Sequence, residues 1–276
     1  MLVCTFDLEP WWVLVPPVVS RADWARLPDR SAEPLARFLD LCDATHSRAT
    51  FFVVGSYART FPRRIREIAD RGHEIGCHSL FHDDLAAQSI DDFARETAEA
   101  KQVLEECSGQ SVAAFRAPSF SVPVQALSEF FQALAGMGFR VDSSLSSAVR
   151  VYGGVRSLPD VGRVFSLREQ LGVDMIEVGV PGVRIFGREL TIFGGGYLRM
   201  TPTSFALAAL RRQDYTVMYL HAHDFDKGSP RVPGATTAQQ LRRSLRMGDM
   251  YSRVESLLTL KRGQTCAAAA AALTIA

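Results

Sequence analysis

The segment "SAEPLARFLDLCDATHSRATFFVV" (residues 31–54) combines the two patterns that decide the fold. Between Leu35 and Cys42, its apolar residues recur at the three- and four-residue spacing of an amphipathic helix. Its end, "ATFFVV" (49–54), is a short run of apolar, β-branched and aromatic residues that is typical of a buried strand. Because "LVCTFDL" (2–8) has the same character, we predict a strand–helix–strand unit at the start of the chain.

The same alternation continues along most of the chain. Helical spacing predicts further helices at 62–72, 89–109, 124–138, 201–213 and 236–261. Short apolar runs predict further strands at 73–78, 112–118, 139–144 and 216–222. Alternating strands and helices form mainly parallel sheets, and six or seven such strands suit an α/β fold of the distorted TIM-like (β/α)7–8 barrel type. An open doubly wound sheet is the alternative.

Residues 146–200 interrupt this alternation. They are rich in glycine and valine, contain turn sequences such as "FGGG", and show no clear helical spacing, which predicts a β-rich insertion. We expect one barrel domain over residues 1–262 that contains this insertion. The final "CAAAAAALTIA" has 11 residues, fewer than the roughly 20 that span a bilayer, so it predicts no transmembrane segment. We interpret residues 263–276 as a low-complexity tail.

Composition excludes several classes of function. The chain has 31 basic and 30 acidic residues, a net charge of +1, so no basic field favours a nucleic-acid partner. Its five cysteines are scattered and odd in number, which argues against a disulfide framework or a cysteine zinc site. The start "MLVCTFDLEPWW" lacks the basic region and long apolar core of a secretory signal. We therefore expect a cytoplasmic protein, and the oligomeric state stays open.

Two groups of polar residues at predicted strand ends are candidates for chemistry. Asp7 and Glu9 are two apart at the end of the first strand, so both carboxylates share one face. In "HSLFHDD" (78–84), His78 and His82 bring two imidazoles onto one metal if residues 78–82 form a helical turn. The alternatives are a carboxylate pair that only ends the strand and histidines that only line a surface loop.

Two further residues lie at strand ends. Arg116 in "FRAPSFS" needs carboxylate partners if it is buried, although a structural salt bridge is the simpler interpretation. His221 ends the strand in "YLHAHDFD". In a parallel barrel the carboxyl ends of the strands share one rim, so all these candidates are expected to converge there.

The order of "TFDLE", "ATFFVVG", "HEIGCHSLFH", "FRAPSFS" and "YLHAHDF" resembles that of the motifs of the polysaccharide deacetylases, carbohydrate esterase family four. The resemblance runs from residue 3 to about residue 226. "VDSS" (141–144) and "GGGYLRMTP" (194–202) are similar to the branch found in bacterial exopolysaccharide gene clusters, including exosortase-associated members.

The resemblance implies that Glu9, His78 and His82 bind a divalent metal ion, usually zinc. It also implies that Asp83 and Asp84 are not ligands, and we expect them to cap or solvate the loop. The family more often has adjacent aspartates, whereas Leu8 separates the two carboxylates in this chain.

The resemblance further implies the acid–base residues. Asp7 corresponds to the catalytic base, Arg116 to the arginine that fixes it, and His221 to the catalytic acid. We expect Asp142 to help orient His221.

The residues expected to contact substrate depart in part from the family pattern. In place of the usual Arg-x-Pro-Tyr, the chain has Ser119 after the proline, so any oxyanion contact is expected from the backbone N–H near Ser119 and Phe120. Trp11, and Tyr197 in "GGGY", favour a groove that stacks on sugars.

These expectations predict a metal-dependent N-deacetylase that acts on an acetamido sugar in a surface glycan or its precursor. Without a secretory signal, a lipid-linked or nucleotide-linked intermediate or a soluble glycan fits best. One alternative is an amidohydrolase for a small non-sugar amide, such as a ureide or formamide. The other is an inactive domain that binds glycan or scaffolds an assembly complex.

Overall fold

The computed structural model describes residues 1–13, 20–148, 158, 160–228 and 250–275. Its main sheet has the strand order β10-β1-β2-β3-β4-β5-β7-β6, with β11 on the free side of the start of β1. Every pairing is parallel except β6 with β7. The strands are β1 (Leu2–Leu8), β2 (Thr50–Val53), β3 (Glu74–Cys77), β4 (Ala114–Phe115), β5 (Val141–Asp142), β6 (Val164–Ser166), β7 (Ile176–Val178), β10 (Thr216–His221) and β11 (Gly263–Gln264).

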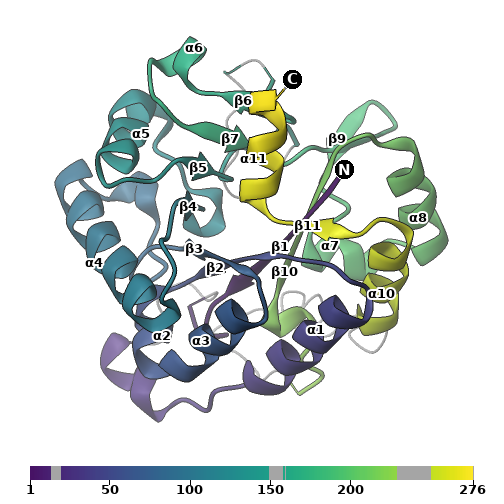
Figure 1. The fold of residues 1–276 in the computed structure, drawn as a ribbon, viewed down its shortest axis with the longest axis horizontal. Coiled ribbons are helices and arrows are strands. Elements are labelled where there is room, and N and C mark those ends of the chain that lie inside the picture. Colours follow the sequence, from purple (N-terminus) through teal and green to yellow (C-terminus); the bar gives the residue numbers. More distant parts are fainter. Residues whose placement is uncertain (14–19, 149–157, 159, 229–249, 276) are drawn as a thin grey trace.

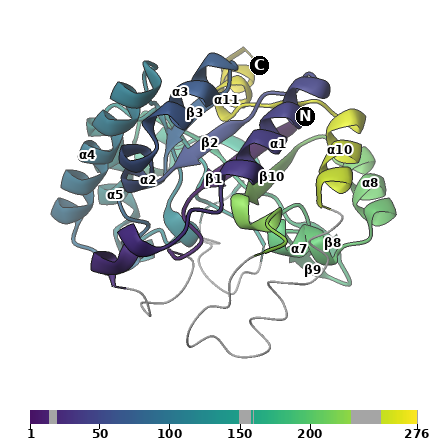
Figure 2. The ribbon, with the colours of Figure 1, turned by 90° about the horizontal axis from the view of Figure 1, so that it is seen from below.

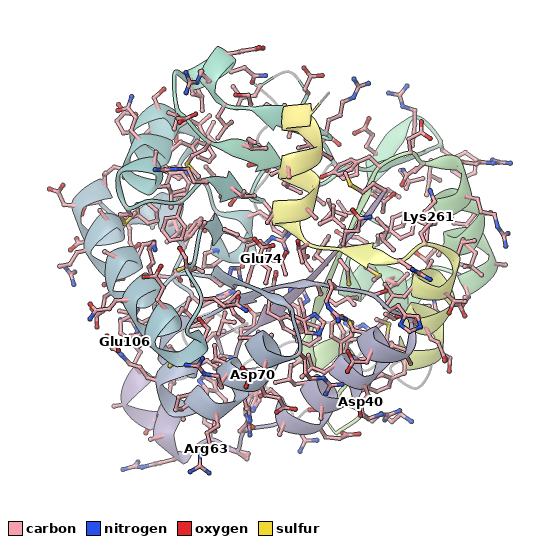
Figure 3. The ribbon with its side chains drawn as sticks, viewed as in Figure 1. Asp40, Arg63, Asp70, Glu74, Glu106 and Lys261 are labelled. Carbon is pink, nitrogen blue, oxygen red and sulfur yellow. The ribbon has the colours of Figure 1, made fainter. Side chains whose placement is uncertain are left out.

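The helices surround this curled sheet (Figure 1), so the predicted α/β barrel is confirmed. They are α1 (Ala32–Ala44), α2 (Gly55–Thr60), α3 (Pro62–Asp70), α4 (Ile90–Ser108), α5 (Leu127–Gly136), α6 (Arg168–Leu171), α7 (Gly195–Met200), α8 (Thr203–Arg212), α10 (Met250–Leu260) and α11 (Cys266–Ile275). Their charged side chains, such as Asp40, Arg63, Asp70 and Glu106, point outward (Figure 3). The apolar faces are therefore left to pack on the sheet.

The predicted first unit forms the centre of the core. Phe6 of β1 packs 4.7 Å from Phe38 of α1 and 5.4 Å from Phe51 of β2, measured between ring centroids. All three rings are fully buried. Burying a large apolar side chain stabilises the fold by about 1.5–3 kcal/mol, so this cluster fixes the position of β1 under its helices.

Helix α4 begins and ends where the sequence predicts. Ser89 Oγ accepts a hydrogen bond from Asp92 N at 3.1 Å, which satisfies one free amide of the first turn. Gly109 ends the helix in the left-handed conformation, with φ +71°. The short helix α2 was not predicted.

The C-terminal residues are not a tail, so this expectation was wrong. Strand β11 pairs with Leu2 and Val3, and α11 contacts β1, β5, β6 and β7. Cys266 and Ala269 are buried in one apolar cluster with Val3 and with the inward-facing residues of other strands. Helix α11 therefore closes the barrel at the end where β1 begins. The alanine-rich sequence did not reveal this role, because the same composition is found in helices that pack closely on strands and in disordered tails.

The predicted insertion is partly integrated into the barrel. Strand β7 extends the main sheet beside β5, with Asp142 paired to Glu177. Among the described residues of the insertion, only β8 (Val183–Ile185) and β9 (Arg188–Leu190) form a separate antiparallel hairpin. Residues 149–157 and 159 of the insertion and residues 236–249 of the predicted last helix lie outside the described residues.

Two expectations about the chain as a whole can be compared with the structure. The five cysteines are free thiols, as expected. Among the described helices, none has the length and apolar character needed to cross a bilayer.

His73 gives the fold a pH-dependent element. It is 1 % exposed, and its Nδ1 accepts a hydrogen bond from Ala49 N at 3.2 Å, which requires a neutral ring. Burial, followed by the nearby positive charge of Arg48, lowers its pKa from 6.5 to about 4. Because the folded state disfavours protonation, stability is full above pH 6.5 and falls as the pH is lowered toward 4.

We therefore expect His73 to reduce the free energy of unfolding by about 2 kcal/mol between pH 7 and pH 5. Urea unfolding at both pH values is the measurement. The His73→Gln variant should lose about that much less than the native chain over this interval. His46→Gln, at an exposed histidine, is the matched control and should behave like the native chain. An equal loss in the His73 variant would contradict the assignment.

Candidate active site

The carboxyl ends of the strands bring the predicted residues together. Asp7 lies opposite His221 in the β1–β10 register. His221 Nε2 is 3.7 Å from Asp7 Oδ2 and 3.9 Å from Glu9 Oε1. His78 and Arg116 directly follow β3 and β4. The predicted convergence on one rim is therefore observed.

Glu9, His78 and His82 offer three ligand atoms that lie within 4.8 Å of one another. His82 Nε2 is 2.6 Å and His78 Nε2 3.6 Å from Glu9 Oε2. Glu9 Oε1 and His78 Nε2 are buried and have no hydrogen-bond partner among the described residues. Buried polar atoms are rarely left in this state, so the three residues fit a divalent cation.

The backbone supports this arrangement. His78 Nδ1 lies 2.8 Å from Arg116 O, and donation to this carbonyl leaves Nε2 as the free acceptor beside Glu9. Burial would raise the pKa of Glu9, but the positive charge of His82 lowers it well below its ordinary value. Glu9 is therefore a carboxylate, as a metal ligand must be.

The loop after β3 is not the helical turn that the spacing requires. Ser79 and His82 have positive φ values of +61° and +66°, a conformation that costs about 1–3 kcal/mol per residue and is concentrated at functional sites. Ser79 Oγ accepts a hydrogen bond from His82 N at 2.9 Å and holds the loop in this form. Asp83 pairs with Arg21, and Asp84 caps the next turn, so neither joins the ligand group, as expected.

Asp7 is held by a fully buried arginine. Arg116 Nη1 donates to Asp7 Oδ1 at 2.8 Å and to Thr5 Oγ1 at 2.7 Å. Its Nε and Nη2 donate to the carbonyl and hydroxyl oxygens of Ser143, at 2.9 and 2.8 Å. The ring of Phe52 lies 4.3 Å from the guanidinium carbon. These bonds fix Asp7 Oδ1 and leave Oδ2 on the side of His221.

Thr5 and Ser143 were not among the predicted site residues. The only sequence feature that includes Ser143 is "VDSS", and a threonine inside a strand gives no functional pattern of its own. Their role depends on contacts with a residue more than 25 positions away.

The acid that orients His221 is Asp224, so the assignment to Asp142 was wrong. Asp224 Oδ2 lies 3.1 Å from His221 Nδ1 and accepts a hydrogen bond from His221 N at 2.9 Å. Burial opposes the positive charge on His221, but the bond and charge of Asp224 raise its pKa to about 9. The "HAHD" sequence could have indicated this pair, because both residues lie on the same short turn.

Asp142 instead supports the loop beneath Arg116. It accepts hydrogen bonds from Ser144 N and Oγ, both at 2.8 Å, and Ser144 Oγ in turn accepts one from Ala117 N. The side chain of Glu177 is hydrogen bonded to Asp142, and burial raises the pKa of both carboxyls. A protonated pair of this kind avoids two adjacent buried charges.

The residues predicted to contact substrate do not form an open groove lined by exposed aromatic rings. Trp11 is 8 % and Phe120 5 % exposed, and Trp11 Nε1 donates to Pro28 O. Ser119 is exposed in a left-handed turn with φ +52°, and Tyr197 lies half-buried on α7. None of these four residues offers a freely exposed aromatic face at Glu9, His78 and His82.

The glycines before Tyr197 serve the site directly. A Cβ atom at Gly195 would lie 1.7 Å from Asp224 Oδ2, and one at Gly194 would lie 2.0 Å from the Tyr219 ring. The "GGG" sequence therefore allows the backbone to approach the acid that holds His221.

Curated relatives match about a third of the chain. The chain is 38% identical over 81 residues to a chitooligosaccharide deacetylase of Sinorhizobium fredii, covering 29% of this chain and 38% of that protein. It is 31% identical over 91 residues to a peptidoglycan-N-acetylglucosamine deacetylase of Bacillus cereus, covering 33% and 32%. The matched part thus spans about a third of each relative.

Solved structures share the fold over nearly the whole chain. A crystal structure from Mycobacterium smegmatis, assigned to the polysaccharide deacetylases, superposes with a TM-score of 0.67 and 18% identity, covering 99% of this chain and 90% of that one. A family 4 carbohydrate esterase from Streptomyces lividans, in complex with acetate, has a TM-score of 0.50 and 15% identity, covering 96% and 90%.

Two family models divide the sequence. Residues 143–270 match a domain of unknown function (DUF3473). Residues 5–140 match the polysaccharide deacetylase family. The N-terminal part of the chain is therefore similar to the polysaccharide deacetylases, and both curated relatives named above are deacetylases.

Proposed function

We propose that this protein is a metal-dependent N-deacetylase that removes the acetyl group from an N-acetylated sugar. The observation that supports it is the meeting of three elements at one rim: the ligand group Glu9, His78 and His82, the fixed carboxylate Asp7, and the His221–Asp224 pair. The names of the relatives, which are deacetylases of chitooligosaccharide and peptidoglycan, agree with this class of substrate.

The ligand group would hold the metal ion, and zinc is the ion that two imidazoles and a carboxylate suit best. When bound, the ion would act as a Lewis acid toward the acetyl carbonyl and lower the pKa of water from 15.7 to about 7.

The chain's own residues supply the proton transfers. Asp7 Oδ1 is occupied by Arg116, so Oδ2 is the atom available to take a proton from the attacking water. His221 faces that oxygen, and its raised pKa keeps it protonated at neutral pH. It can therefore donate a proton to the leaving nitrogen, while Asp224 holds the ring in place.

The finer assignment follows from the sequence. On the similarity of "VDSS" and "GGGYLRMTP" to the exopolysaccharide branch, we propose a glycan precursor as substrate, and on the five scattered cysteines we propose a cytoplasmic location. A small-amide hydrolase and an inactive glycan-binding domain are the competing outcomes of the experiments below.

Metal-loaded protein should release acetate from N-acetylated oligosaccharides. The Asp7→Asn variant should be slower by roughly 10²- to 10⁴-fold, because it lacks the base but keeps the bulk of the side chain. Released acetate is measured with each of several divalent metals, and small ureides and formamides are tested in parallel. No acetate from any oligosaccharide with any metal would sink the deacetylase proposal.

Glu9→Ala should weaken zinc binding by at least tenfold, because it removes the only carboxylate of the group. Isothermal titration of the metal-free protein with Zn²⁺ gives the dissociation constant. Asp84→Ala is the control, since that carboxylate is adjacent in sequence but caps a turn, and its affinity should be unchanged. Full zinc affinity in Glu9→Ala would remove Glu9 from the site.

Thr5→Val should lower kcat about tenfold with little change in KM, because Arg116 loses one acceptor and holds Asp7 less firmly. Thr5→Ser keeps the hydroxyl and should restore kcat. In an Asp7→Asn background, Thr5→Val should have no further effect. An equal loss in Thr5→Ser, or an undiminished loss in the Asp7→Asn background, would show that Thr5 acts only on packing.

A further inference from the structure

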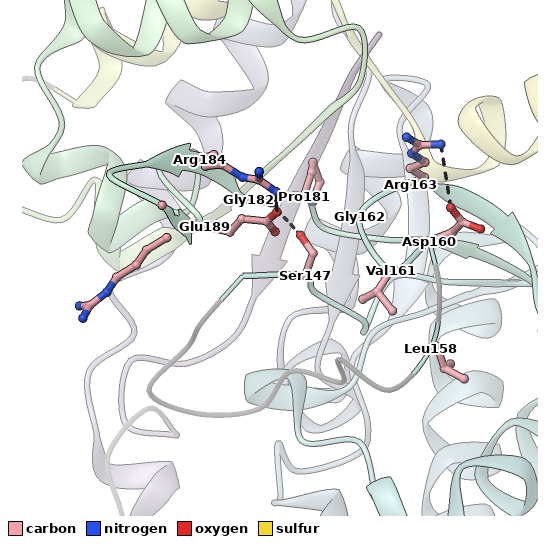
Figure 4. A pocket seen from close by; sticks show the side chains of 12 residues that line it. Ser147, Leu158, Asp160, Val161, Gly162, Arg163, Pro181, Gly182, Arg184 and Glu189 are labelled. Atoms are coloured by element: carbon pink, nitrogen blue, oxygen red, sulfur yellow. Dashed lines mark hydrogen bonds and ion pairs between the residues drawn. The ribbon is translucent and has the colours of Figure 1, made fainter.

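The region that matches the domain of unknown function builds a second feature, a cleft of about 730 Å³. Its volume is typical of ligand-binding clefts. Figure 4 shows Arg184 and Glu189 on one side, Arg163 and Asp160 on the other, and Ser147 between them. None of these residues takes part in the network around Asp7 and the ligand group.

Topology places the cleft at the strand ends that carry the catalytic residues. Ser147 follows β5, and the β8–β9 hairpin follows β7. Arg163 precedes β6, which runs antiparallel to β7, so it too belongs to that end of the sheet. Figure 2 shows β8 and β9 beside α7, whose first glycine lies against Asp224. A chain bound at the catalytic rim can thus extend toward this cleft.

The lining offers hydrogen-bond donors and acceptors side by side. The Arg184–Glu189 and Arg163–Asp160 pairs are 3.6 and 3.9 Å apart, longer than hydrogen bonds. The arginine side chains are 76 % and 78 % exposed, so these pairs contribute little to stability. Hydroxyl groups both donate and accept, and neighbouring sugar hydroxyls match planar guanidinium and carboxylate groups. The chemistry therefore suits a carbohydrate.

The tip of the hairpin adds an aromatic surface. Phe186 is fully exposed, and its φ of +47° is followed by +78° at Gly187. Two-residue turns of this kind favour Asn, Asp or Gly, and a bulky residue there is an outlier. Both the exposure of the Phe186 ring and its backbone conformation are therefore unfavourable for the stability of the fold. Phe186 does not line the cleft itself, but it lies between Arg184 and Gly187, which do, and its exposed ring is suited to stack on the apolar C–H face of a sugar.

We propose that the cleft and Phe186 together bind the part of the glycan that adjoins the reacting sugar. The identity of this glycan as substrate rests on the proposed function, but the binding itself does not. The site would give the protein a preference for an oligosaccharide over a single acetylated unit.

Binding is tested by the fluorescence anisotropy of two labelled probes, a neutral chitohexaose and an acidic heparosan hexasaccharide. The Asp7→Asn background prevents hydrolysis. Phe186→Asn, which suits the left-handed turn, and Arg184→Gln should each weaken the binding of at least one probe about fivefold or more. Phe205→Ala and Arg211→Gln, at exposed positions on α8, are the matched controls and should bind like the parent.

Failure of both probes to bind, or equal affinity in the cleft variants and the controls, would overturn the cleft proposal. Failure of the deacetylase proposal has a different result, because acetate release would be absent while the probes still bind and the cleft variants still weaken them. If acetate is released but both cleft variants bind the probes with unaltered affinity, the deacetylase proposal stands and the cleft proposal fails.

Discussion

The hydrogen bonds of the buried Arg116 are the interaction on which the site depends. A guanidinium with no exposure is tolerated only if its charge is paired and its donors are satisfied. Asp7, Thr5 and both oxygens of Ser143 meet this requirement. Removing one partner of a buried ion pair costs about 3–5 kcal/mol, so the orientation of Asp7 is fixed by the folding of the sheet itself.

Arg116 also contacts both Asp7 and the ligand group. The carbonyl of Arg116 accepts the bond from His78 Nδ1, while its side chain holds Asp7. One residue directly after β4 thereby sets the relative position of His78 and Asp7, which come from two other strands. A shift of β4 would disturb both groups together, which explains why two serines and a buried carboxyl pair brace the adjacent loop.

The sequence predicted the parts of the site that follow from strand order. Asp7, His78 and His221 each end a parallel strand, and parallel strands end at one rim. The sequence could not predict the features that depend on loop conformation. The positive φ values at Ser79 and His82, for example, do not follow from any periodic pattern of residues. Whether Asp142 or Asp224 is the partner of His221 likewise depends on the conformation of the loops that carry them.

The boundary between the two family matches separates residues that lie together in the candidate active site. The first half supplies Asp7, the ligand group and Arg116, and its match ends at residue 140. Ser143, which holds Arg116, and the His221–Asp224 pair all belong to the region matched as a domain of unknown function. Strand β10 of that region lies beside β1, so the two halves share one sheet. The second region is thus a structural part of the same site, and the neighbouring residues Asp7 and His221 come from different halves.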